Sequence, residues 1–520
     1  MQLNPIFLEI FKNKLSSIAE EMGVTLNRTA FSPNIKERRD FSCALFNAQG
    51  EMIAQAAHIP VHLGSMPLSV QAALQEIDFA PGDMVVLNDP FKGGTHLPDI
   101  TIIAPVFVGN SQQPEFFVAN RAHHSDVGGM SSGSMPLSTS IYQEGIVIPP
   151  LKIMEKGNID PKVMKLFLNN VRTPTEREGD FTAQIMANEV GIKRIQEVVS
   201  KYGLEQVKFY ADGLLDYAEK MLQELILRMP NGHYEFEDYL EDDGLGQKDI
   251  KIHLQIEVNH HTVTLDFRQS APQVKGSVNA VFAITLSAVL YVFRSLLSQD
   301  VPTNSGLLRP IKILTTPGSV VDAKFPAGVA GGNVETSQRI VDVILGALAK
   351  AIPEQIPAAS QGTMNNITIG GVDQNGQPFT YYETLGGGMG ASAHLHGASG
   401  VHSHMTNTLN TPIEALEFSY PFLVTKYGLR TNSGGKGKFR GGEGLIREIK
   451  LLTPAEVTVL SERRRLRPYG LDGGEPGQPG KNLLVQDGEV RQLPGKFNLS
   501  LEKETIIRIE TPGGGGYGKI

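Results

Sequence analysis

Two short segments hold the residues of this sequence that are best suited to catalysis. The segment DPFKGGTHLPD contains His96 and Asp99, and the later segment ANRAHHSD contains the adjacent pair His123 and His124. Imidazole nitrogens and carboxylate oxygens bind divalent transition metals, and a metal with an open coordination position can activate water or polarise a carbonyl. The pattern indicates a metal-dependent enzyme. The alternative is a set of loop histidines that only form hydrogen bonds.

The turn that carries His96 and Asp99 is predicted to be short and rigid. Gly93 and Gly94 permit backbone angles that are closed to other residues, and Pro98 biases the residue before it towards an extended conformation. A helix is therefore disfavoured here. Side chains three positions apart across such a turn can point to one centre.

The run from Phe116 to His123 reads as a β-strand. In regular alternation Arg121 and His123 share one face, while His124 points to the other. Only one of the two adjacent histidines should then reach the metal, and we expect it to be His123. Arg121, on the same face, is a candidate contact for an anionic group of a substrate.

Two carboxylates that follow these motifs are candidate general bases. Glu144, in YQEGIVIPP, could accept a proton from a reacting water if it lies within hydrogen-bond reach. A structural ion pair or a loop hydrogen bond is the alternative role. Asp126, just after the histidine pair, is a similar candidate and could instead orient an imidazole.

Six further histidines lie in two segments with less specific patterns. They are His58, His62, His394, His396, His402 and His404. For the first two we expect packing or support of a ligand rather than ligation. The other four could form a second metal site, but a glycine-rich loop that lines a channel or an interface is the favoured interpretation.

Composition excludes several classes of protein. The chain has 520 residues, a net charge of −8 and a pI of about 5.9, so it lacks the basic surface of a nucleic-acid-binding protein. Its one cysteine, Cys43, allows neither an intrachain disulfide nor a cysteine-based metal site. The apolar stretch 278–293 is short for a membrane span and contains polar residues, so it predicts a buried helix. With no recognisable leader at the start, we expect a soluble, cytoplasmic protein without membrane contact.

The distribution of residue types predicts a mixed α and β (α+β), multi-domain fold with a β-rich C-terminal part. We expect three regions with soft boundaries: an N-terminal metal-site region at 1–215, a middle α/β region at 216–355 and a glycine-rich, β-rich region at 356–520.

Helix signals are clear at four places. We expect a helix from Pro5 to about Gly23, one over 160–170, a long one over 181–222 that breaks near Gly191 or Gly203, and one over 335–350 that is capped by Asn333.

Six segments together resemble the hydantoinase B/oxoprolinase family. They are HIPVHLGSMP (58–67), NDPFKGGTHLPDI (88–100), ANRAHHSDVGG (119–129), YQEGIVIPPLKI (142–153), HMTNTLNTPIE (404–414) and TPGGGGYG (511–518). The resemblance runs in the same order from about Ile35 to the C-terminus. The family includes B subunits of ATP-dependent N-methylhydantoinases, similar lactam hydrolases and a homologous subunit of acetone-type carboxylases.

The resemblance implies a metal site made of Asp40, His96, Asp99 and His123, in which Asp40 rests on the resemblance alone. If the strand that follows Asp40 alternates regularly, Asp40 and Cys43 lie on opposite faces. Cys43 is then better explained as a small core residue than as a nucleophile in the metal site.

The resemblance also implies a function. We expect a subunit of an ATP-dependent hydrolase that opens a small cyclic amide (a hydantoin, oxoproline or lactam) after a hydantoinase A-type partner in the same hetero-oligomer phosphorylates it. The resemblance implies that ATP binds to that partner, and the glycine-rich segments of this chain do not match phosphate-binding loops. One divalent metal is expected, zinc first, with manganese or iron as alternatives.

Two other functions stay open. The chain could be a subunit of a ketone carboxylase that uses bicarbonate at the same metal, or a non-catalytic scaffold built around a structural metal.

Overall fold

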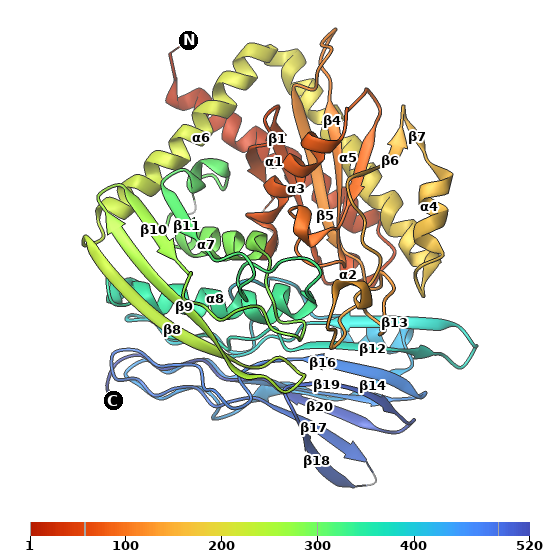
Figure 1. The fold of residues 1–520 in the computed structure, drawn as a ribbon, viewed down its shortest axis with the longest axis vertical. Helices are drawn as coiled ribbons and strands as arrows, with labels where there is room; N and C mark the ends of the chain where they lie inside the picture. Colours follow the sequence, from red (N-terminus) through yellow and green to blue (C-terminus); the bar gives the residue numbers. More distant parts are fainter. Residues whose placement is uncertain (1, 57–58, 299, 487) are drawn as a thin grey trace.

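A computed structural model, which describes residues 2–56, 59–298, 300–486 and 488–520, contains helices and four β-sheets (Figure 1). The predicted mixed α and β fold is confirmed. One seven-stranded sheet belongs to the N-terminal part of the chain, and two sheets of the C-terminal part lie together at the lower end of the view in Figure 1.

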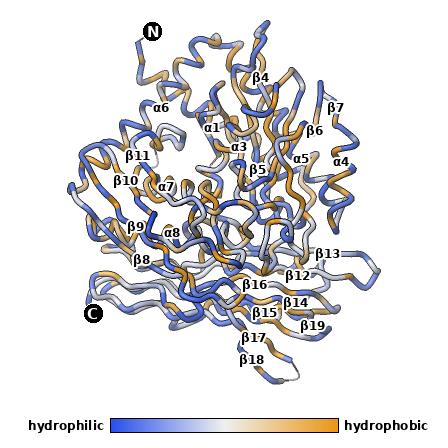
Figure 2. Tube along the Cα trace, viewed as in Figure 1, coloured by the Kyte–Doolittle hydropathy of each residue, from blue (hydrophilic) through white to orange (hydrophobic). Residues whose placement is uncertain are grey.

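The seven-stranded sheet is packed on both faces. Helices α1 (Pro5–Thr29) and α5 (Pro174–Tyr202) cover one face, and α3 (Ser65–Glu76) covers the other. In sheet order the strands are β2 (Met52–Gln55), β1 (Phe41–Asn47), β5 (Phe116–His123), β4 (Asp99–Val106), β3 (Met84–Leu87), β6 (Leu151–Glu155) and β7 (Asn158–Ile159). Figure 2 shows apolar residues along these strands, as burial on both faces requires.

Alternation along β5 is regular. Val118 and Ala122 pack into the core shared with α1 and α5, whereas Phe117 and Ala119 pack into the core on the α3 side. Cys43 belongs to the first of these cores and is buried, which agrees with its predicted role as a core residue.

The predicted helices are present, but they begin or end at other residues than predicted. Helix α1 continues through Gly23 to Thr29, because Leu26 extends its buried stripe beyond the glycine. Helix α4 spans Pro161–Leu168. The long helical segment breaks at Gly203, between α5 and α6 (Leu204–Leu227), and runs unbroken through Gly191.

The middle of the chain forms a four-stranded sheet and two helices that pack on each other. Its strands are β8 (Gly232–Asp242), β9 (Lys248–Asn259), β10 (Thr262–Asp266) and β11 (Ile311–Leu314), and the helices are α7 (Phe282–Ser295) and α8 (Ser337–Leu348). The apolar stretch 278–293 is therefore mostly the buried helix α7, as predicted. Among the described residues, no helix is both long and apolar enough for a membrane crossing. The cytoplasmic location stays a prediction.

The prediction that Asn333 caps a helix is wrong. A π-helical turn spans Gly332–Thr336 and leads directly into α8, so Asn333 lies inside a helical segment. The turn is already helical before Asn333, since the Gly332 N–H donates to the Val329 carbonyl.

Two sheets of the C-terminal part share one core. Apolar residues of both sheets, such as Ile367, Val457, Ile449 and Ile507, pack together. The strands are β12 (Asn366–Val372), β13 (Pro378–Glu383), β16 (Ala455–Leu460) and β19 (Lys496–Leu501) in one sheet, and β14 (Phe422–Arg430), β15 (Gly444–Leu451), β17 (Lys481–Gln486), β18 (Glu489–Leu493) and β20 (Ile506–Glu510) in the other. The β-rich C-terminal prediction is thus confirmed.

Residues 513–516, all glycine, run between other backbone segments. The Gly514 N–H donates to the Gly442 carbonyl at 3.0 Å, and the Gly515 N–H donates to the Ala359 carbonyl at 2.8 Å. A Cβ atom at Gly514 would lie 2.1 Å from the carbonyl oxygen of Met389. Only glycine lets these backbone segments approach one another so closely.

The three predicted regions do not each have a separate hydrophobic core. The largest core contains residues as far apart as Phe11, Leu240, Ile344 and Leu460. Residue 215 lies within α6. The region limits stay a prediction.

A buried ion network joins the middle sheet to the C-terminal part. Arg339 lies 3.0 Å from Asp238 and 3.3 Å from Glu462, and Arg463 lies 2.6 Å from Asp342. We expect Arg339→Met to lower the free energy of unfolding by about 3–5 kcal/mol, because it removes one of the buried cations that compensate Asp238, Asp342 and Glu462. Denaturant unfolding would measure the change. Arg268→Met, at an exposed pair with Asp266, is the control and should change little, and an equal loss in both variants would contradict the expectation.

Candidate metal centre

The candidate ligands come from three adjacent strands. Asp99, the first residue of β4, pairs directly with His123, the last residue of β5. Asp40 precedes β1, and its carbonyl accepts a hydrogen bond from the His123 N–H at 3.0 Å. These three residues therefore form one row across the end of the sheet.

His96 reaches the same point from the turn before β4. The Asp99 N–H donates to the His96 carbonyl, and the Asn88 side chain donates to the Leu97 carbonyl, so the turn is held at both ends. His96 Nε2 lies 3.2 Å from His123 Nδ1 and 3.4 Å from Asp99 Oδ1, and His123 Nδ1 lies 3.3 Å from Asp99 Oδ1. All three side chains are buried.

This cluster fits a divalent metal. Ligands at about 2.0–2.2 Å from a tetrahedrally coordinated ion lie about 3.4 Å from one another, which matches the observed spacing. A proton can link only one pair of these three atoms, and Asp99 Oδ1 has no hydrogen-bond partner. A buried carboxylate oxygen without a donor is costly. A cation among the three atoms would compensate it.

The electrostatics of the cluster favour a charged carboxylate and a neutral imidazole. Burial raises the pKa of Asp99, but His96, His62 and His123 outweigh burial and hold that pKa well below its usual range. Burial lowers the pKa of His123. An ionised Asp99 and an unprotonated His123 are the forms that bind metals.

His124 points away from the cluster, as the alternation predicted. Its Nε2 lies 2.9 Å from the Gln184 side-chain oxygen, and its ring packs 4.9 Å from the ring of Phe181, both on α5. Burial lowers its pKa to about 4. Of the adjacent pair, His123 is the one near His96 and Asp99.

Asp40 and His62 line the same cavity as Asp99 and His123. Asp40 is not among the residues whose ligand atoms all lie within 4.8 Å of one another, which are His96, Asp99 and His123. His62 Nε2 lies 3.4 Å from Asp99 Oδ2, and its Nδ1 lies 2.9 Å from Ser42 Oγ. His62 thus supports Asp99, while His58 lies outside the described residues.

The cavity at the cluster is small. Its volume of about 20 Å³ is enough for one water molecule. Residues from distant parts of the chain complete its wall, among them Asn333, Tyr382, Met405, Thr406 and Thr408. A ring substrate can therefore enter only when part of this wall moves aside.

Tyr382 supports His123 from the C-terminal part. Its ring stacks on the His123 ring with centroids 4.4 Å apart, and the Arg38 guanidinium lies 4.9 Å from the Tyr382 centroid. Arg38 also donates to Thr384 and to the Tyr382 carbonyl. Sequence reasoning missed Arg38 and Tyr382, and only the position of Arg38 two residues before Asp40 offered a signal.

Glu144 is buried and half satisfied. Its Oε1 accepts hydrogen bonds from Ser138 Oγ and from the N–H groups of Val329 and Ala330, whereas Oε2 has no partner. Burial raises its pKa to about 7, against the opposing effect of these hydrogen bonds and of His96. A carboxyl with a pKa near neutrality and one unpaired oxygen suits proton transfer.

Arg121 and Asp126 are tied to partners inside the protein. Arg121 donates to the hydroxyls of Thr101, Ser65 and Ser69 at 2.8, 2.5 and 2.7 Å. An anionic substrate group would have to displace these partners. Asp126 accepts from both the N–H and the side chain of Arg172. Both arrangements favour structural roles.

The four histidines of the segment 394–404 divide into two pairs. His394 and His396 are exposed, and His396 Nδ1 accepts from the Arg440 N–H. Burial lowers the pKa of His402 and of His404 to about 4. Among the described residues, the only group of side chains arranged to hold a metal is that of His96, Asp99 and His123.

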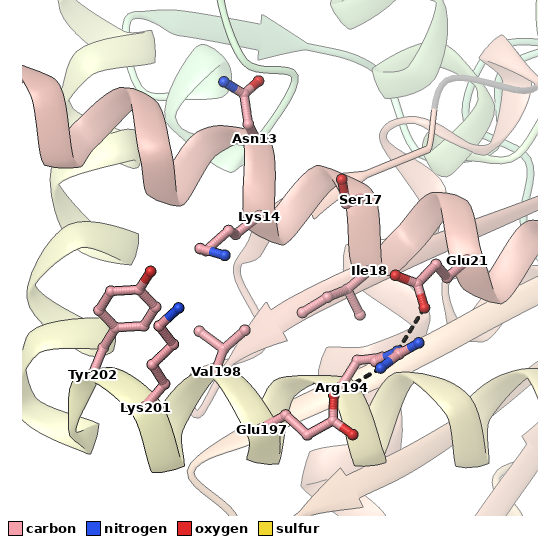
Figure 3. A pocket seen from close by; sticks show the side chains of 10 residues that line it. All are labelled: Asn13, Lys14, Ser17, Ile18, Glu21, Arg194, Glu197, Val198, Lys201 and Tyr202. Carbon is pink, nitrogen blue, oxygen red and sulfur yellow. Dashed lines mark hydrogen bonds and ion pairs between the residues drawn. The ribbon is translucent and has the colours of Figure 1, made fainter.

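A larger groove lies elsewhere, between α1 and α5 (Figure 3). Its volume is about 450 Å³, and its lining includes Lys14, Lys201 and Arg194, the last paired with Glu21 and Glu197. It shares no lining residue with the cavity at His123. The groove has no part in the chemistry of the cluster.

The chain belongs to the hydantoinase B/oxoprolinase family, whose model matches residues 4–520. It is 41% identical to an uncharacterised protein of Methanocaldococcus jannaschii, over 99% of this chain and 91% of that one. It is 42% identical to 5-oxoprolinase 1 of Arabidopsis thaliana over 98% of this chain, but it spans only 41% of that protein's length.

Two solved structures share the fold. An ATP-dependent caprolactamase from Pseudomonas jessenii matches with a TM-score of 0.93 and 30% identity, over 100% of this chain and 92% of the other. A nucleotide-free acetone carboxylase matches with a TM-score of 0.91 and 17% identity, over 99% of this chain and 76% of the other. The second likeness concerns the fold alone.

Metal analysis tests the cluster directly. We expect the purified chain to hold about one divalent ion, and His96→Ala or Asp40→Ala to lose it, because each removes a predicted ligand. His124→Asn is the matched control and should keep the metal, since His124 faces α5. A metal-free wild type after reconstitution with zinc, manganese and iron would refute the site.

Proposed function

We propose that this chain is the metal-dependent catalytic subunit of an ATP-dependent cyclic amide hydrolase. Its substrate would be a small hydantoin, oxoproline or lactam ring, activated by phosphorylation on a hydantoinase A-type partner. The buried cluster of His96, Asp99 and His123 carries the proposal, because it combines close ligand spacing with an unsatisfied carboxylate oxygen. Membership of the family and the likeness to the caprolactamase support the choice of reaction.

The protein groups have separate roles in this proposal. His96, Asp99 and His123 hold the ion, with Asp40 as the fourth predicted ligand. When bound, the ion supplies Lewis-acid chemistry that activates water and polarises an oxygen atom. Zinc is the first candidate, and manganese or iron also suit two imidazoles and two carboxylates.

Glu144 is proposed as the general base. Oε1 is held by Ser138 and two backbone N–H groups, so the carboxyl cannot turn freely. Oε2 is left to accept the proton of the attacking water.

An assay with the partner tests the function. The chain, co-expressed with an A-type subunit, should convert 5-oxoproline, hydantoin or ε-caprolactam to its ring-opened product only when ATP is present. His96→Ala should lower the rate by about 10²-fold or more, because the ion cannot be held. ATP consumption that instead required bicarbonate and a ketone would favour carboxylation. A partner fully active without this chain would favour a scaffold.

The role of Glu144 predicts a pH dependence. A base must be ionised, so with a pKa raised to about 7 kcat/KM should rise as the pH increases through 7 and then level off. Glu144→Gln should lower kcat/KM by about 10²–10⁴-fold and remove this limb of the profile. Glu414→Gln, at an exposed carboxylate, is the control. If Asp126→Asn removed this rise of kcat/KM with pH and Glu144→Gln kept it, the base would be Asp126.

A further inference from the structure

Asn333 places an unsatisfied amide in the wall of the cavity at the metal centre. It is 4% exposed and lines the same cavity as Asp99 and His123. Its Oδ1 has no hydrogen-bond partner. By contrast, the side chains of Thr384 and Thr408 in this wall bond to each other. A buried amide oxygen without a hydrogen-bond donor is costly to keep, so a donor from a ligand is to be expected.

The backbone holds Asn333 firmly in this position. Its N–H donates to the Val329 carbonyl at 3.3 Å, and its carbonyl accepts from Ser337 Oγ at 2.7 Å. A Cβ atom at the preceding Gly332 would lie 1.8 Å from the carbonyl oxygen of Asn279, so the turn is packed tightly against that segment. The turn is π-helical, a local form that is frequent at functional sites.

The chemistry of a carboxamide points to the class of ligand. Asn333 offers one donor group and one acceptor atom side by side. Phosphorylation of the amide oxygen removes the carbonyl acceptor of a cyclic amide but leaves the ring nitrogen. When this nitrogen carries a hydrogen, it can donate to Asn333 Oδ1, the atom that has no partner. A ketone has no ring nitrogen and cannot make this hydrogen bond.

We propose that Asn333 Oδ1 accepts a hydrogen bond from the ring N–H of the substrate and so selects cyclic amides over ketones and over rings without an N–H. This inference rests on the proposed function and adds the residue that recognises the substrate. The ring would take the place of the water for which the cavity has room, with displacement of the wall around Met405 and Thr406. Sites that bond a substrate N–H discriminate strongly against analogues that lack it.

The experiment compares wild type, Asn333→Ala and Asn333→Asp, each loaded with metal. Binding of ε-caprolactam and of N-methylcaprolactam, which lacks the N–H, is measured by ligand-observed NMR. KM and kcat for ε-caprolactam are measured with the A-type partner and ATP. The wild type should prefer the lactam with the N–H by about tenfold or more, and Asn333→Ala should lose this preference and raise KM by a similar factor.

Metal content serves as the check on folding, and all variants should retain it. Asn110→Leu, at an exposed residue of the β4–β5 loop, is the control and should match the wild type. Unchanged KM and unchanged preference in Asn333→Ala would overturn the inference, as would a wild type that binds neither lactam. If the wild type turned over no ring amide, the proposed function would fall. Selective binding that Asn333→Ala abolished would still support the role of Asn333.

Discussion

The pairing of β4 with β5 is the constraint on which the site depends. It sets Asp99 opposite His123, and the adjacent β1 adds Asp40 to the same row. Because side chains alternate along each strand, the next row on this face holds Arg121 between Ser42 and Thr101. A slip of one residue in β5 would turn His123 towards α5 and bring His124 into the row.

Contacts with neighbouring elements hold the polar side chains of this row in place. Each guanidinium nitrogen of Arg121 donates to a hydroxyl group of α3 or β4, so its positive charge is held in a fixed place near Asp99. Its pKa falls to about 10 through burial, and it remains protonated near neutrality. Tyr382 fixes the His123 ring from another sheet. The site therefore needs both the N-terminal sheet and the C-terminal sheet that contains Tyr382.

The approach of His96, Asp99 and His123 to one point could be predicted from sequence because it depends on short-range rules, whereas Asp40 was indicated by the family resemblance alone. Strand alternation separated His123 from His124, and glycine and proline defined the turn at His96. The wall of the cavity could not be predicted in this way. Tyr382, Met405 and Asn333 reach the site through tertiary packing, and Asn333 also resembles a helix cap in sequence although the helical turn begins before it. The helix end at Gly23 was misjudged for a similar reason, since burial of Leu26 outweighs the glycine.

The glycine run at 513–516 has a consequence for biosynthesis. It lies between backbones that include Met389, Gly442 and Ala359, and its own N–H groups satisfy carbonyls of the last two. A ribosome delivers these glycines only after all the segments that surround them, and their partners stay unsatisfied until then. The C-terminal sheets therefore cannot reach their final packing before the glycine run has left the ribosome, and until then a nascent chain exposes them to chaperones or to aggregation.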